Sequence, residues 1–338
     1  MAGAASRSTS DEPRSPAGAR ARPRAHGLEP ARVRLAALLL PAALGLGAAS
    51  ASGSGSPGAA APLPGERPAA GRPVTGAPDH ECHLFGYVFG AGAGSESWLR
   101  ALGEDLHQQS RQGRASRDGW GFAYFLSPPL PWIARPIMLR GGAPACEDDS
   151  RWEAAIGEIA DRGLAGASVV FGHVRNSSSG PDGGALPDPH PFADSLAGRW
   201  WLCAHNGATP PDTLLGWLDP AFLEAHPLDY APLHVDSELL FRYCLQEIAA
   251  AGGVRAGLRA ALGRIASGHY ACNLCLTDGD TLWAAHSFPQ VPFYYGPAGN
   301  GRAWWASVIP ADEGAAAMEN DHLYWFAPGG MGAVSYAR

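Results

Sequence analysis

Residues 80–90 read HECHLFGYVFG, and the fold of the chain can be worked out from this stretch outward. Apolar and β-forming side chains alternate after residue 82, a pattern typical of a half-buried β-strand. Cys82 stands directly before this strand, in the position of a nucleophile mounted on the edge of a core. Glu81 precedes it rather than a methionine, so the cysteine lies well inside the translated chain.

The segment before this strand predicts a leader rather than a folded domain. Arg32 and Arg34 flank a short apolar run over residues 35–46, and small residues follow in the sequence GAASASG. This three-part pattern predicts a secretory signal peptide over residues 1–53, and therefore export to the periplasm or the medium. The alternative is a low-complexity tail without a role in export, in which case the protein stays in the cytoplasm.

Two further expectations concern this N-terminal part. The apolar run is short and broken by proline, so it predicts no stable membrane span. Residues 54–81 consist mostly of proline, glycine and alanine, which predicts a disordered linker or a propeptide. The folded domain is expected over residues 82–338.

Composition limits the classes of function. Hydrophobic residues make up 46% of the chain and charged residues 17%, which is enough for a substantial core. The net charge of −7 gives no electrostatic case for binding nucleic acid. Six cysteines are too few for a disulfide-built scaffold of this length, although a disulfide among the five after Cys82 stays open.

Helical and strand-like periods are intermixed along the rest of the chain. Helical spacing occurs over residues 95–110, 151–164, 235–252 and 253–265. Strand-like patterns occur over residues 119–126, 167–174 and 199–207 and in a series of short segments from residue 270 onward. The Asp-Gly-Asp turn at 278–280 indicates an antiparallel hairpin. We therefore expect an α+β fold with largely antiparallel sheets.

Polar residues cluster where four of these segments begin or end. They are Cys82, Arg175 in GHVRNSSSG (172–180), Asn206 and Gly207 in CAHNG (203–207), and Asp236 in HVDSE (234–238). Each has an ordinary structural interpretation: a small core residue, a surface ion pair, a hairpin turn and a helix N-cap. Functional sites are often built at such positions, so the four are considered together.

In this order the clusters resemble the class II, or N-terminal-nucleophile, glutamine amidotransferases. The segments CHLFGYVFG, DGWGFAYF (118–125), HPF (190–192), AHNG (204–207) and DSELLF (236–241) resemble its stand-alone branch. That branch includes YafJ-like proteins and the γ-glutamyl hydrolases of ergothioneine synthesis and glutathione breakdown. The resemblance implies an Ntn-hydrolase αββα sandwich, in which two antiparallel sheets lie between helical layers.

The resemblance also implies catalytic roles. Cys82 would attack the γ-glutamyl amide carbonyl to form a thioester, with its own α-amino group as the base. Asn206 and Gly207 would stabilise the oxyanion. Arg175 would bind the substrate α-carboxylate, and Asp236 would bind its α-ammonium group.

Three more residues are expected to line the substrate site by the same resemblance. Ser178 would touch the α-carboxylate, while Gly119 and Trp120 would shape the wall of the pocket. No residue pattern indicates a metal or an organic cofactor. Cys272 and Cys275 form a C-x-x-C pair, which we interpret as core cysteines because they lie in a predicted strand and no second pair has metal-site spacing.

The chain departs from the family pattern at two points. Most relatives expose the α-amine by losing an initiator methionine, whereas here Glu81 precedes Cys82. Certain phosphoribosylpyrophosphate amidotransferases carry a propeptide ending in Glu, so we expect cleavage of the Glu81–Cys82 bond. No acceptor domain is recognised after Asp236, which favours hydrolysis of glutamine or another γ-glutamyl compound unless a separate subunit accepts the ammonia.

Two other functions remain open from the sequence. A non-catalytic relative would bind γ-glutamyl or amino-acid ligands without turning them over, and it would have no use for an oxyanion hole at Asn206 and Gly207. A secreted thiol peptidase would depend on His173 or His205 as the base.

Overall fold

The computed structural model describes the greater part of the chain after residue 81. The described residues are 82–89, 96–112, 118–126, 135–163, 167–176, 190–232, 234–299, 302–307, 315–327 and 330–337. The predicted signal peptide, the predicted linker or propeptide and Ser178 lie outside them.

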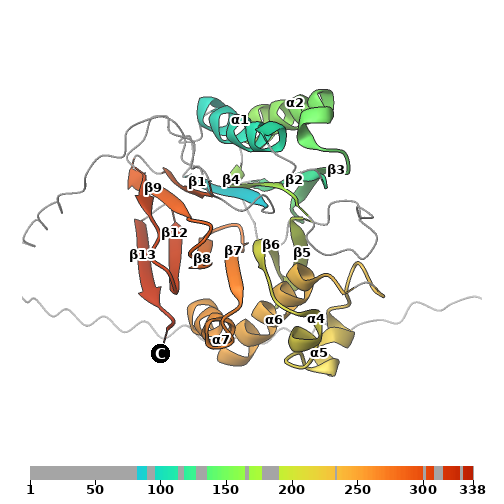
Figure 1. Cartoon of the computed structure of the whole chain (residues 1–338), viewed down its shortest axis with the longest axis vertical. Coiled ribbons are helices and arrows are strands. Elements are labelled where there is room, and N and C mark those ends of the chain that lie inside the picture. The colour runs from blue at the N-terminus through green and yellow to red at the C-terminus, as the bar shows by residue number, and fades with distance from the viewer. Residues whose placement is uncertain are drawn as a thin grey trace, which may run out of the picture. The chain divides into compact units, whose positions relative to one another are not determined.

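Two antiparallel sheets form the centre of this part of the protein (Figure 1). The seven-stranded sheet has the order β11-β9-β10-β1-β4-β2-β3. Its strands are β1 (His83–Phe89), β2 (Trp120–Leu126), β3 (Ile137–Gly141), β4 (Ala167–Val174), β9 (Tyr294–Gly299), β10 (Arg302–Ala306) and β11 (Ala316–Ala317). The six-stranded sheet has the order β13-β12-β8-β7-β6-β5. Its strands are β5 (Phe192–Leu196), β6 (Arg199–Ala208), β7 (Ala271–Thr277), β8 (Leu282–Ser287), β12 (His322–Ala327) and β13 (Gly330–Ser335).

Helices cover the outer face of each sheet, which gives the expected αββα order of layers (Figure 1). Helices α1 (Glu96–Gln112) and α2 (Asp149–Glu158) pack on the seven-stranded sheet, and α2 continues into a π-helical turn at Ile159–Gly163. Helices α6 (Asp236–Ala251) and α7 (Val254–Ser267) pack on the six-stranded sheet. The short helices α4 (Pro211–Leu215) and α5 (Pro220–Ala225) precede α6. The predicted α+β class and antiparallel sheets are confirmed.

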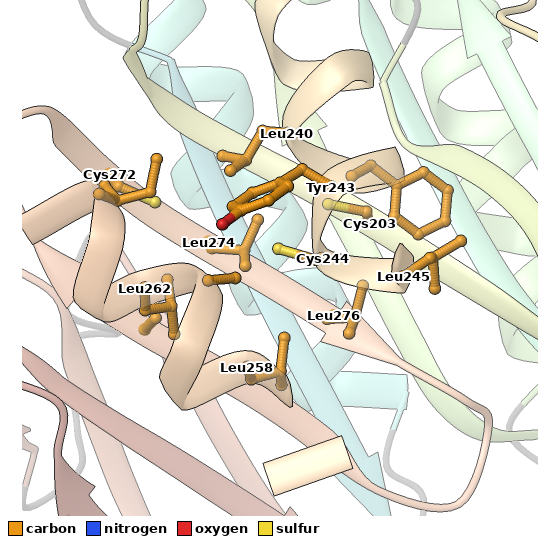
Figure 2. Close-up of a cluster of buried hydrophobic side chains, with 14 of the residues drawn as sticks. Cys203, Leu240, Tyr243, Cys244, Leu245, Leu258, Leu262, Cys272, Leu274 and Leu276 are labelled. Carbon is orange, nitrogen blue, oxygen red and sulfur yellow. The ribbon is translucent and has the colours of Figure 1, made fainter. Parts of the chain in front are cut away.

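Each interface between layers has its own apolar core, because strand side chains alternate between the two faces of a sheet. Trp120 and Phe122 of β2 belong to the core beneath α1 and α2, which also includes Trp152 of α2. Phe171 of β4 and Leu202 of β6 belong to the core between the two sheets. The third core, beneath α6 and α7, is shown in Figure 2.

The cysteines after Cys82 serve mainly as packing residues. Cys203, Cys244 and Cys272 lie in the core beneath α6 and α7 (Figure 2), whereas Cys275 faces the other sheet. Burial raises the pKa of all four thiols, so they stay protonated. All six cysteines are free thiols. The interpretation of the C-x-x-C pair as core cysteines is confirmed, and the described residues hold no group of three or more potential metal ligands.

Three strands were not predicted from the sequence. β3, β5 and β11 are terminal strands of their sheets, and most of their residues are partly buried or exposed. As for membrane spans, no helix in the described ranges combines the length and apolar character needed to cross a bilayer.

Gly121 provides a test of how closely the chain packs over β2. A Cβ atom on Gly121 would overlap the carbonyl oxygen of His190. We expect Gly121→Ala to lower the free energy of unfolding by about 1–3 kcal/mol, because a backbone atom must move to make room. The matched control is Gly157→Ala in α2, where a Cβ meets nothing within 4 Å. That change should raise the free energy of unfolding by about 0.5–1 kcal/mol. Urea unfolding of both variants measures the difference. Equal stability of the two would contradict the close packing of Gly121 against the His190 carbonyl.

Candidate active site

Three predicted site residues lie side by side at the ends of neighbouring strands in the seven-stranded sheet. His83 in β1 pairs with Val174 in β4, and Val174 pairs with Trp120 in β2. Cys82, Arg175 and Gly119 each lie one residue beyond these paired positions. The Arg175 N–H donates a hydrogen bond to the Gly119 carbonyl over 2.9 Å, which continues the ladder past the strand ends.

The thiol of Cys82 is held by the main chain of Asn176. The Asn176 N–H donates to Cys82 Sγ over 3.2 Å, and the Cys82 thiol donates to the Asn176 carbonyl oxygen over 3.4 Å. Cys82 is 9% exposed. Within the described residues, these contacts join the thiol to backbone groups beside Arg175. A cysteine–histidine couple would instead require a contact between the thiol and an imidazole.

The residues expected to form the oxyanion hole come from the other sheet. Asn206 lies near the end of β6, and its Nδ2 donates a hydrogen bond to the carbonyl oxygen of Cys82 over 2.7 Å. This bond crosses from one sheet to the other and brings the Asn206 carboxamide to Cys82. A carboxamide has two N–H donors, so the second can serve an oxyanion formed at the same place.

Gly207 follows Asn206 in a conformation that a side chain would disturb. Its φ is +156°, and a Cβ atom there would overlap the carbonyl oxygen of Ala271 in the neighbouring strand β7. Glycine therefore permits β6 and β7 to approach closely beside the predicted oxyanion donors.

Asp236 begins helix α6 with both carboxylate oxygens near backbone donors. The Ser237 N–H donates to Oδ1 over 2.8 Å, and the Thr209 N–H donates to Oδ2 over 3.4 Å. The helix N-terminus also favours a negative charge at this position. These contacts fix the direction of the carboxylate expected to bind the substrate ammonium group.

Ser237 connects Asp236 to His205, the residue before Asn206. The Ser237 hydroxyl lies 2.9 Å from His205 Nδ1 and 3.4 Å from Asp236 Oδ1. His205 and Ser237 are both buried, with 1% and 5% of their surface exposed. A chain of polar contacts thus runs from β6, which carries Asn206 and Gly207, to α6, which carries Asp236.

Several histidines around the two sheets are held in the neutral form. Burial, reinforced by His173, lowers the pKa of His83 to about 4. Burial also lowers the pKa of His286 to about 4, with a weaker opposing effect from Asp321. For His205, burial lowers the pKa, Asp236 opposes this shift, and His173 adds to it.

These histidines predict a loss of stability in mild acid. A histidine that stays neutral in the folded state but protonates near 6.5 in the unfolded chain binds more protons when unfolded. The stabilisation is therefore complete above pH 6.5 and declines as the pH falls from 6.5 toward 4. We expect His83 and His286 each to add up to about 1.4 kcal/mol per pH unit to this decline.

Urea unfolding at pH 7.5, 6.5, 5.5 and 5.0 measures this slope. His286→Gln serves as the comparison, since it removes one of the titrating groups. It should lower the slope of unfolding free energy against pH by up to about 1.4 kcal/mol per pH unit. A slope identical in the two proteins would show that His286 titrates normally in the folded state.

Most predicted site residues that the structure describes are brought together, but Trp120 is not. The Trp120 ring lies on the helix-covered face of the sheet, 5.3 Å from the Trp152 ring, and its Nε1–H donates to Asp148 Oδ2 over 3.1 Å. Alternation along β2 places it on the face opposite Gly121, which packs beneath His190 on the inner side.

Three contributions to the site were not assigned from the sequence. Asn176 acts through its main chain, so its residue type carries no signal. Ser237 was given no role in the substrate site, and His205 was interpreted only as a possible base for a peptidase. The spacing of His205 and Ser237 along the chain gave no indication that they meet.

Comparison with known proteins identifies the family of the chain. The model of the family described as class-II glutamine amidotransferases matches residues 82–292, more than half of the chain. The match begins at Cys82 and includes the residues proposed to form the site. No curated protein matches the chain at a significant level.

The chain is similar to several solved structures at low sequence identity. A structure described as the allosteric regulatory enzyme of purine biosynthesis aligns with a TM-score of 0.50 at 19% identity, covering 76% of this chain and 49% of that one. The glutamine phosphoribosylpyrophosphate amidotransferase of B. subtilis aligns with a TM-score of 0.49 at 17% identity, with the same coverage of 76% and 49%. A glutamine aminotransferase class-II domain protein from Silicibacter pomeroyi gives 0.47 at 18% identity, covering 76% of this chain and 100% of that one.

The chain spans about half the length of the first two structures, as the 49% coverage shows. The fold is the αββα sandwich of the N-terminal-nucleophile hydrolases, as the resemblance implied. From the family match over residues 82–292, the chain belongs to the class II glutamine amidotransferases.

Proposed function

We propose that the protein hydrolyses the γ-glutamyl amide of glutamine or of another γ-glutamyl compound through a thioester on Cys82. The observation that carries this proposal is the 2.7 Å hydrogen bond from Asn206 Nδ2 to the Cys82 carbonyl oxygen. It joins the oxyanion donor to the nucleophilic residue across the two sheets. Arg175 lies beside Cys82 at the end of β4, and this placement supports binding of the substrate α-carboxylate next to the thiol.

The reaction begins after cleavage of the Glu81–Cys82 bond, which converts the peptide nitrogen of Cys82 into an amine. Its ordinary pKa of about 7.7–8.0 suits an amine for taking the thiol proton at neutral pH. The Sγ then attacks the amide carbonyl, and Asn206 and the Gly207 N–H stabilise the oxyanion. Collapse transfers the proton to the departing ammonia or amine, and water hydrolyses the thioester to release glutamate.

The amino-acid end of the substrate is bound by opposite charges. The Arg175 guanidinium presents paired N–H donors that suit a carboxylate. Asp236 at the start of α6 accepts the α-ammonium group. Gly119 adjoins Arg175, and Ser178 is proposed as a further carboxylate contact. Export directed by residues 1–53 would make external γ-glutamyl compounds the natural substrates.

A substitution of Asn206 separates an enzyme from a non-catalytic binder. We expect Asn206→Ala to lower kcat by about 10²–10³-fold with a smaller change in KM, because the lost donor acts mainly on the charge of the transition state. Glutamate release from glutamine and from γ-glutamyl peptides provides the measurement. Circular dichroism and thermal unfolding of the variant verify that it folds, since Asn206 also binds the Cys82 carbonyl.

The same assay distinguishes the other candidate functions. A binder would show saturable binding of glutamine without glutamate release by the processed unsubstituted protein. A thiol peptidase would cleave ordinary α-peptides as well as γ-glutamyl ones. Either result would overturn the proposed function.

A further inference from the structure

We propose that His205 is a positioning residue that acts through Ser237 to hold the Asp236 carboxylate in the direction required by the substrate α-ammonium group. The inference rests on the proposed function, because it assigns the support of one of the substrate-binding residues. It gives His205 a role different from that of a catalytic base for Cys82.

The direction of the His205 side chain is the first step. Along β6, Asn206 reaches toward Cys82 of the other sheet, whereas His205 reaches Ser237 at the start of α6. Consecutive residues of a strand face opposite sides of the sheet. One dipeptide therefore supports both ends of the substrate site: Asn206 at the scissile carbonyl and His205 at the helix that presents Asp236.

Burial is the second step. The hydrogen bond between His205 Nδ1 and Ser237 Oγ is a buried contact of 2.9 Å between segments 32 residues apart in sequence. Within a protein such a bond is stronger than in water, and loss of one partner leaves the other without solvent to replace it. The pair therefore has the rigidity needed to fix the first turn of α6.

Ser237 contacts the Asp236 carboxylate at one oxygen atom, Oδ1. Oδ1 accepts the Ser237 N–H over 2.8 Å and lies 3.4 Å from the Ser237 hydroxyl, while Oδ2 is contacted by the Thr209 N–H. Ser237 is thus the residue whose backbone and side chain both meet the carboxylate. When the Ser237 side chain loses its His205 partner, we expect the carboxylate to become less well oriented for a cation.

Paired substrates that differ only in the α-amino group isolate this effect. L-glutamine carries the amine, whereas glutaric acid monoamide has the same carboxylate and amide but lacks it. We make both variants in the full chain and cleave it before Cys82. We then expect Ser237→Ala and His205→Leu to raise the KM for glutamine about tenfold, while kcat stays within about twofold of the unsubstituted protein. The KM for the monoamide should stay unchanged.

His205→Asn is the matched conservative variant, because an asparagine amide nitrogen can replace the Nδ1 atom as a partner of Ser237. It should restore the KM for glutamine close to that of the unsubstituted protein. Equal losses for both substrates in all His205 variants would overturn the proposal, since they would indicate general damage to the core or to Asn206.

Binding of the reaction product provides a readout that needs no turnover. In the Cys82→Ala background, calorimetry should show that the preference for L-glutamate over glutarate shrinks about tenfold when Ser237→Ala or His205→Leu is added. If the unsubstituted protein turns over no γ-glutamyl amide, the proposed function fails. The binding result then still decides the role of His205: an unchanged preference, or no preference at all in the Cys82→Ala protein, overturns it.

Discussion

Replacement of Cys82 by alanine is expected to abolish hydrolysis of γ-glutamyl amides, with a loss of at least about 10⁴-fold in kcat. The thiol is the one proposed group that forms a covalent bond with the substrate. Its position is set by the Asn176 main chain and by the Asn206 bond to its carbonyl oxygen, so the loss of Sγ leaves the binding groups in place. Glutamate release measured with the cleaved protein gives the result.

A second cysteine provides a matched control for this substitution. Cys146 is more accessible than the buried Cys82. It lies in the 3-10 turn Ala145–Glu147 before α2, where its Sγ donates to the Ser110 carbonyl of α1 over 3.3 Å. Cys146→Ala should keep full activity. If the Cys82→Ala protein still hydrolyses glutamine at a rate near that of the control, Cys82 is not the nucleophile.

Cleavage before Cys82 is expected to raise activity by at least about 10²-fold, because a general base contributes about 10²–10⁴-fold and an amide nitrogen cannot act as one. The full-length chain with a specific protease site ending at residue 81 can be assayed before and after cutting. Intact-mass analysis verifies that the mature chain then begins at Cys82.

The control for cleavage carries the same protease site about ten residues upstream. Cutting there removes most of the residues before Cys82 but leaves Glu81 attached to it, so the protein should remain inactive. Full activity of this product, or a natural mature chain that retains Glu81, would contradict the role of the Cys82 amine.

The sequence predicted the central strands and the long helices because their periodicity reflects burial on one or two faces. β3, β5 and β11 were missed for a physical reason: each is a terminal strand of its sheet and is only partly buried or exposed. Terminal strands are paired on one side only, so their residue pattern depends less on the core. Their existence follows from the partner strand rather than from their own residues.

The site shows a similar division. Roles for Cys82, Arg175 and Asn206 were expected from the family resemblance, because each residue taken alone also has an ordinary structural interpretation. The main-chain contacts of Asn176 and the meeting of His205 with Ser237 depend on how β4, β6 and α6 pack, which local spacing does not encode. For Trp120, alternation along β2 and packing against α2 determine the direction of the ring.

Covalent labelling tests the central claim most directly. The glutamine analogue 6-diazo-5-oxo-L-norleucine, incubated with the cleaved protein, should inactivate it and modify Cys82, as located by peptide mass spectrometry. Glutamine in excess should protect against the modification, and Cys82→Ala should remain unlabelled. Inactivation with the label on another residue, or hydrolysis that continues when Cys82 is fully modified, would contradict the assignment of Cys82 as the nucleophile.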